Sequence, residues 1–177
     1  APVILFFGYI RKYKGLDILL RAMPQMLARL PELRLLVAGE FYGDEKEYRA
    51  LIEELRIPAK NLVLATDYIP NDEVAVYFSA ANVCVLPYRS ATQSGIVLVA
   101  YNFDVPAIAT DVGGLAEVVK DGESGLIAPK ATPKAIAEKV IQFFEEKLEE
   151  RLTRGVTQEK QKYSWDVFAE GIETLKL

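Results

Sequence analysis

Three cations gathered between two glycines are the first residues of this sequence that suit ligand binding. The segment from Gly8 to Gly15 carries Arg11, Lys12 and Lys14. Gly8 lets the backbone approach a ligand closely, and Gly15 precedes a helical pattern whose first N–H groups would point back at the same place. Fixed positive charge beside a helix N-terminus is an arrangement that binds a diphosphate. The alternative interpretation is a solvated basic turn.

A second polar segment runs from Pro87 to Gly95. It holds Arg89, then hydroxyl and amide side chains that include Gln93 and Ser94, and it ends at Gly95, where a further helical pattern starts. Free N–H groups at such a start suit phosphate or sugar oxygens. The alternative is ordinary capping of the helix by Ser94.

A third segment, from Asp111 to Glu117, places Gly113 and Gly114 between an apolar run and another helical pattern. The two glycines could present further backbone amides to the same ligand. They could equally form a tight connection and nothing more, and the sequence leaves both interpretations open.

The elements that must position these segments alternate between buried strands and amphipathic helices. Six short apolar runs are typical of strands, at Val3–Phe7, Leu33–Ala38, Asn61–Ala65, Val83–Leu86, Val105–Thr110 and Gly125–Ile127. The helical patterns between them predict an α/β fold, a Rossmann-like, doubly wound, six-stranded parallel sheet. For the common strand order 3-2-1-4-5-6, ligands bind where strand order reverses, between strands one and four. The first two polar segments follow those two strands.

Two helix starts and the C-terminal region carry further predictions. Asn71 is expected to cap the helix that ends near Ala81, and Thr132 with Pro133 to open a helix that ends near residue 146. Residues 145–162 are strongly charged, which indicates a solvated helix or a linker. A last amphipathic helix, capped by Ser164, is expected to carry Trp165, Phe168, Ile172 and Leu175. We expect residues 1–177 to form a single domain.

Composition excludes several kinds of chemistry. The chain has 177 residues, no histidine and one cysteine, so a histidine base, a histidine metal ligand and an internal disulfide are all excluded. The formal net charge of −4 argues against a nucleic-acid partner. The sequence contains neither a Walker A motif nor a GxGxxG motif, and no cluster with metal-ligand spacing. Cys84 lies in an apolar run and indicates a buried thiol in a reducing compartment. We expect a cytoplasmic domain without a signal peptide, membrane contact, metal or cofactor.

Six motifs in order resemble a known family. From Val3 to Ala128 the chain is similar to the C-terminal, nucleotide-sugar-binding half of GT-B glycosyltransferases of group 1, also called family 4. The motifs are Gly8–Gly15, Leu33–Gly39, Asn61–Val63 with Tyr68–Val74, Tyr77–Ala81, Val105–Val119 and Asp121–Leu126. The resemblance implies transfer of a sugar from a nucleotide diphosphate sugar to an acceptor, with retention of configuration and without a metal.

The resemblance also implies roles for individual residues. Lys14 falls on the family lysine that holds the donor diphosphate. The family arginine position is Tyr9 here, and Arg11 is expected to supply that charge instead. Tyr68 and Ile69 would lie against the base. The residues expected at the diphosphate and the sugar are Gly8, Arg11, Lys14, Gln93, Ser94, Gly95, Gly113 and Gly114.

The sequence departs from the family at a motif of two glutamates. Those positions are Ala91 and Val99 here, so both carboxylates are absent. The second glutamate accepts hydrogen bonds from ribose hydroxyls in the family, and Val99 cannot do so. Gln93 or Ser94 is expected to compensate at the donor. The segment from Ala91 to Gly95 resembles a recurrent variant within the family.

The resemblance covers half of a two-domain enzyme. We expect the missing partner to be an N-terminal, acceptor-binding domain, and we expect the isolated chain to bind a nucleotide sugar without turning it over. A different interpretation is a degenerate, non-catalytic Rossmann module kept for protein–protein contact, which the absent glutamates favour. A sugar-nucleotide epimerase of related architecture is a third interpretation, disfavoured by the absence of histidine.

Overall fold

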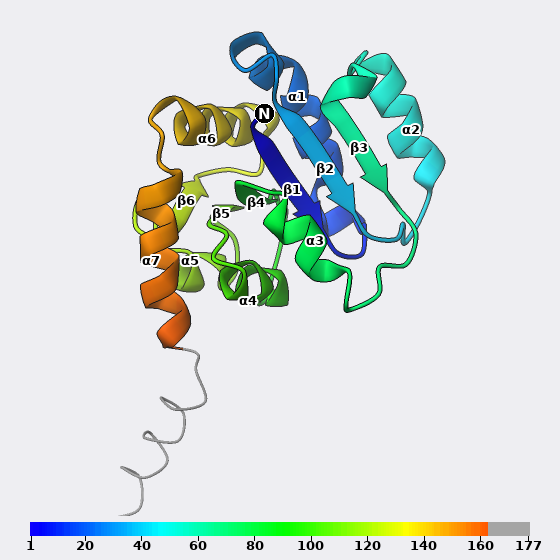
Figure 1. Cartoon of the computed structure of the whole chain (residues 1–177). Coiled ribbons are helices and arrows are strands. Elements are labelled where there is room, and N and C mark those ends of the chain that lie inside the picture. Colours follow the sequence, from blue (N-terminus) through cyan, green and yellow to red (C-terminus); the bar gives the residue numbers. More distant parts are fainter. Residues whose placement is uncertain (163–177) are drawn as a thin grey trace, which may run out of the picture.

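The fold is a six-stranded sheet with helices on both faces (Figure 1). The computed structural model describes residues 1–162. The strands are β1 (Val3–Phe7), β2 (Arg34–Ala38), β3 (Leu62–Ala65), β4 (Val83–Leu86), β5 (Ala107–Thr110) and β6 (Gly125–Ala128). The helices are α1 (Leu16–Arg29), α2 (Glu45–Glu54), α3 (Val74–Ser79), α4 (Gly95–Asn102), α5 (Leu115–Val118), α6 (Pro133–Glu145) and α7 (Glu149–Gln161).

All six strands are parallel and lie in the order β3-β2-β1-β4-β5-β6. Leu5 at the centre of β1 aligns with Leu36 of β2 on one side and with Cys84 of β4 on the other. The predicted Rossmann-like fold and strand order are therefore confirmed. Because strand order reverses between β1 and β4, the loops that follow these two strands lie at the same carboxyl edge of the sheet.

Alternate residues of the strands pack into two separate cores. In β4, Val83 and Val85 pack with α1, α2 and α6, whereas Cys84 and Leu86 pack with α3, α4 and α5. Figure 1 shows α3 and α4 on the near side of the sheet and α1 on the far side. A strand buried on both faces needs apolar side chains at every position, which explains the continuous apolar runs. Cys84 is a fully buried free thiol, as predicted.

One predicted helix start is confirmed and another is wrong. Thr132 caps α6 through its side chain, with Pro133 in the first turn. Asn71 does not cap α3, which begins after Glu73. The chain first closes a turn in which the Glu73 N–H donates to the Pro70 carbonyl at 2.9 Å. This turn leaves Asn71 exposed, outside the helix, at the carboxyl edge of the sheet.

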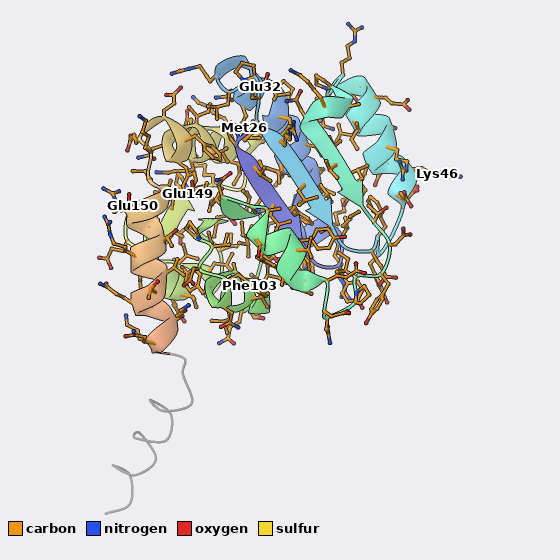
Figure 2. All side chains as sticks on the ribbon, in the orientation of Figure 1. Met26, Glu32, Lys46, Phe103, Glu149 and Glu150 are labelled. Atoms are coloured by element: carbon orange, nitrogen blue, oxygen red, sulfur yellow. The ribbon has the colours of Figure 1, made fainter. Side chains whose placement is uncertain are left out.

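The charged segment after α6 forms a helix, and it is solvated on one side only. Helix α7 packs beside α4 and β6. Leu152, Val156 and Glu159 are buried at a spacing that places them on one helix face, so the prediction of a fully solvated segment is wrong for that face. Figure 2 shows Glu149 and Glu150 at the first turn of α7, where acidic side chains complement the helix dipole.

The predicted last helix, with Ser164, Trp165, Phe168, Ile172 and Leu175, lies outside the described residues. The interpretation of residues 1–177 as one domain therefore stays a prediction. Within residues 1–162, none of the helices combines the length and the apolar character that a membrane crossing requires.

Candidate functional site

Two loops at the reversal of strand order lock against each other. We call residues 8–15 the first loop and residues 87–95 the second loop. Gly15 has φ +72°, and a Cβ at this position would overlap the carbonyl oxygen of Pro87. Only glycine adopts this positive φ without strain and, having no side chain, lets the Pro87 carbonyl approach so closely. The Arg89 N–H donates to the Tyr13 carbonyl at 2.7 Å, which ties the backbones of the two loops together.

The Arg89 side chain binds groups within the protein that join the two loops, and is not left free to bind a ligand. Its guanidinium donates to both carboxylate oxygens of Asp17 in α1, at 2.8 and 2.6 Å, and to the Lys12 carbonyl at 2.9 Å. Burial works to raise the pKa of Asp17, but the hydrogen bonds and the charge of Arg89 outweigh it, so the pKa is lowered. Asp17 in turn raises the pKa of Arg89. The pair stays ionised and holds the first loop in place.

The third loop, residues 111–117, closes onto the second. A Cβ on Gly113, which has φ +51°, would overlap the Ala91 carbonyl oxygen. The Gly114 N–H donates to the Thr92 carbonyl at 3.0 Å. The sequence left open whether these glycines bind a ligand or form a tight connection. The Gly114 amide forms a tight connection, because its N–H is already bonded within the protein. The buried Thr110 hydroxyl, at the end of β5, donates to the Tyr88 carbonyl at 2.6 Å and completes the junction.

A pocket of about 350 Å³ opens at the carboxyl ends of β1 and β2. The first loop, the start of α4 and the segment between β3 and α3 all contribute to its wall. The lining residues are Phe7, Gly8, Tyr9, Lys14, Gly39, Glu40, Tyr68, Ile69, Asn71, Val74 and Ile96. Four predicted site residues are among them: Gly8, Lys14, Tyr68 and Ile69.

Lys14 is the cation of this pocket. Its residue is 8% exposed, and its ammonium lies 5.9 Å from the centre of the Tyr88 ring. Burial lowers the pKa of Lys14, the nearby charge of Arg11 lowers it further, and Cys84 acts in the opposite direction. Among residues 1–162, no carboxylate forms an ion pair with this ammonium. A largely buried cation without an anionic partner favours an anionic ligand.

Gly8 keeps space open between the ammonium and α4. A Cβ at Gly8 would stand 3.0 Å from the Lys14 Nζ and 3.2 Å from the Ile96 Cδ1. Such a side chain would crowd the group that carries the charge. The absence of a side chain at this position therefore leaves the Lys14 ammonium accessible from the pocket.

The remaining predicted residues are not among those that line the pocket. Arg11 is exposed, and its guanidinium stacks 4.4 Å from the centre of the Tyr42 ring. Ser94 precedes α4 without capping it through its side chain, and its hydroxyl lies 3.5 Å from the Tyr88 hydroxyl. Gly95 is exposed with open space around its Cα, and Gln93 is exposed beside Gly114. Their roles at a donor stay predictions.

Several residues that line the pocket were not predicted from the sequence to be site residues. Glu40 directly follows the glycine that ends β2, and Asn71 lies in the turn before α3. Ile96 is in the first turn of α4, one position after Gly95. Glu40 carried a usable signal, because residues at the carboxyl ends of parallel strands line the ligand edge. Within residues 1–162, no group of three or more cysteine, aspartate or glutamate side chains is arranged to hold a metal ion.

Comparisons with known proteins agree on one family. The family described as "Glycosyl transferases group 1" matches residues 1–146. A D-inositol 3-phosphate glycosyltransferase of Acidothermus cellulolyticus is 30% identical over 178 residues, which cover 96% of this chain and 39% of the relative. The chain thus spans about two fifths of the length of the curated relatives that it matches.

Solved structures share the fold. The C-terminal domain of a glycosyl transferase group 1 family protein (LpcC) from Francisella tularensis has a TM-score of 0.82 at 22% identity, over 93% of this chain and 87% of that one. Anabaena HepE, solved in complex with UDP, has a TM-score of 0.81 at 19% identity, over 98% of this chain and 48% of that one.

Proposed function

The chain belongs to the glycosyl transferases group 1 family, and from this premise we propose that it is the donor-binding half of a glycosyltransferase. In this proposal the pocket beside the first loop holds the nucleotide diphosphate of a sugar donor, and the sugar passes to an acceptor with retention of configuration. No metal and no cofactor take part. The D-inositol 3-phosphate glycosyltransferase relative and the UDP complex of HepE support the substrate class.

The single observation that carries the proposal is the buried, unpaired ammonium of Lys14. Keeping an uncompensated cation away from water costs free energy, which a bound anion would return. The diphosphate of a nucleotide sugar supplies that anion. As the glycosidic bond breaks, further negative charge develops on the leaving diphosphate oxygen, and a fixed ammonium stabilises that charge. Lys14 would therefore favour both binding and bond cleavage without a metal ion.

The acceptor needs a second binding surface. Because the curated relatives are more than twice the length of this chain, we propose that a further domain binds the acceptor and closes over the donor. Closure orients the reactants and excludes water. The chain of 177 residues would then bind the donor but neither transfer nor hydrolyse the sugar at an appreciable rate.

Calorimetric titration of the 177-residue chain tests the proposal. We expect at least one of UDP, GDP and ADP to bind, with the same affinity in EDTA and in magnesium. Absence of binding by all three at millimolar concentration would contradict the donor role. A strict requirement for magnesium would contradict the metal-independent mechanism. Retention is tested in the complete enzyme, by the anomeric configuration of the first-formed product.

A non-catalytic interaction module is the second candidate, and specific residues favour it. Both motif glutamates are absent, at Ala91 and Val99, and Arg89 is engaged with Asp17. A module of this kind would have no use for an unpaired ammonium in a pocket. If Lys14→Ala left all nucleotide binding unchanged, this second function would be preferred to the first.

A further inference from the structure

We propose that Glu40 binds the ribose of the donor nucleotide and replaces the glutamate that is absent at position 99. The inference rests on the proposed function and adds a specificity-determining residue to the same pocket. Glu40 follows β2, whereas the absent glutamate would stand on α4, so the ribose contact comes from a different element of the fold. The ligand class is a nucleoside diphosphate with an intact 2′,3′-diol.

The backbone around Glu40 is fixed on both sides. The Glu40 carbonyl accepts the Ile10 N–H at 2.8 Å, which joins it to the first loop. The preceding Gly39 N–H donates to the Ala65 carbonyl at the end of β3, at 2.9 Å. Glu40 therefore stands on rigid backbone between β1 and β3. The backbone position from which the Glu40 side chain enters the pocket is therefore fixed before a ligand binds, which reduces the entropy cost of binding.

The carboxylate of Glu40 has no partner of its own. Glu40 is partly buried, and within residues 1–162 its side chain makes no hydrogen bond or ion pair. It is also the only carboxylate among the residues that line the pocket. An ionised carboxylate accepts hydrogen bonds and donates none, so its complement is a ligand group with O–H or N–H donors.

Glu40 and Lys14 line the same pocket, and this limits which part of the nucleotide can supply the O–H or N–H groups. If the ammonium holds the diphosphate, the carboxylate of Glu40 must face an uncharged part of the nucleotide, because like charges repel. The ribose follows the diphosphate directly and offers two adjacent hydroxyls to the two carboxylate oxygens. In Rossmann folds that bind NAD, an acidic residue accepts a hydrogen bond from a ribose hydroxyl, which is a precedent for a carboxylate in this role. Val99, in contrast, offers no acceptor and does not line the pocket.

Titrations with matched ribose and deoxyribose ligands test the inference. The probes are UDP and GDP, each beside its 2′-deoxy analogue, and inorganic pyrophosphate as a ligand without ribose. In the unaltered chain we expect the better ribonucleotide to bind about 10- to 100-fold more tightly than its deoxy form, the usual range for a hydrogen bond to a charged group. Glu40→Ala should remove that preference, and Glu40→Gln should retain part of it.

Pyrophosphate separates a lost ribose contact from a damaged pocket. Its affinity should stay unchanged or rise in Glu40→Ala, because a negative charge has been removed. Glu73→Gln is the matched control: it removes one exposed charge next to α3, outside the pocket wall, and should keep the full ribose preference.

The outcomes distinguish this inference from the function on which it rests. A ribose preference that survives in Glu40→Ala, or equal binding of both sugars by the unaltered chain, overturns the role of Glu40 and leaves donor binding intact. Failure of the unaltered chain to bind any nucleoside diphosphate overturns both. Weaker pyrophosphate binding in both Glu40 variants, with unchanged ribose preference, assigns Glu40 to pocket structure instead.

Discussion

The guanidinium of Arg89 forms a bidentate ion pair with the carboxylate of Asp17, 72 residues away in the sequence. Nη1 donates to Oδ1 at 2.8 Å and Nη2 donates to Oδ2 at 2.6 Å. Nη1 also donates to the Lys12 carbonyl in the first loop. The ion pair thus joins the loop after β4 to the loop after β1 and to α1. These are the elements that hold Lys14 in the pocket, so the pair stabilises the geometry of the candidate site.

Breaking this pair should lower stability modestly. Both side chains are partly exposed, so Arg89→Ala and Asp17→Ala should each lower the free energy of unfolding by about 1 kcal/mol, and the double variant should cost little more than either single one. Urea denaturation of the four proteins measures this coupling. Because the pKa of Asp17 is lowered on folding, its contribution is present above pH 3.8 and disappears as the pH falls through the folded-state pKa.

Arg154→Ala provides the control for this prediction. It removes an ion pair to Glu150 on the exposed face of α7, where the side chains are 68% and 86% exposed. Its cost should stay within about 0.5 kcal/mol. Strict additivity of the Arg89 and Asp17 substitutions would show that the two side chains stabilise the fold independently.

Substituting Gly15, which packs against the Pro87 carbonyl, should lower the free energy of unfolding more than breaking the Arg89–Asp17 pair does. Gly15→Ala meets both an unfavourable φ of +72° and the Pro87 carbonyl, so the two loops must separate. Gly122→Ala meets only the unfavourable φ, of +76°, in open space. We expect Gly122→Ala to cost about 1–2 kcal/mol and Gly15→Ala to cost clearly more, as measured by thermal or urea unfolding. Equal costs would mean that the loops do not press on each other at Gly15.

Cys84 predicts a specific alkaline destabilisation. Burial raises the pKa of the Cys84 thiol from 9.0 to about 12. Above pH 9 the thiol therefore ionises in the unfolded chain but not in the folded chain, and stability falls by up to about 1.4 kcal/mol per pH unit. Other groups titrate in the same range, so the measurement is the difference between the parent chain and Cys84→Ala.

The difference in free energy of unfolding between the parent chain and Cys84→Ala should be constant below pH 9. Above pH 9 the parent chain should lose stability relative to Cys84→Ala. A thiol reagent at neutral pH gives an independent check, because the buried thiol should react only as fast as the chain opens. Rapid reaction of the native chain, together with a difference that does not change with pH, would place Cys84 in contact with solvent.

The fold could be predicted because local signals agreed with the global arrangement. Val83 to Leu86 is apolar at every position, which suits a strand buried on both faces. The prediction at Asn71 failed because its cap signal competes with a turn from Pro70 to Glu73, and the turn prevails. The buried face of α7 was missed because Leu152 and Val156 are the only strongly apolar residues within this charged helix, and their partners are distant in the sequence.

The candidate site was predictable in its position and less so in its contacts. Lys14 lies in the pocket because it belongs to the loop after β1, at the reversal of strand order. Arg89 lies in the equivalent loop after β4, yet its partner is Asp17, which sequence spacing cannot indicate. Arg11 rests on Tyr42 through a contact between two loops, which is equally invisible in a single sequence.

Whether the Lys14 ammonium binds the diphosphate is decided by comparing the affinity of Lys14→Met for a nucleoside diphosphate with that of Lys12→Met. Both substitutions remove one cation from the same loop, but Lys12 is exposed and does not line the pocket beside Gly8. We predict that Lys14→Met weakens binding of UDP or GDP by about 10- to 100-fold, as the loss of a charged contact in a desolvated site should, while Lys12→Met changes it by less than about threefold, as expected of a screened surface charge. Equal effects of the two substitutions would show that Lys14 is not the residue that binds the diphosphate.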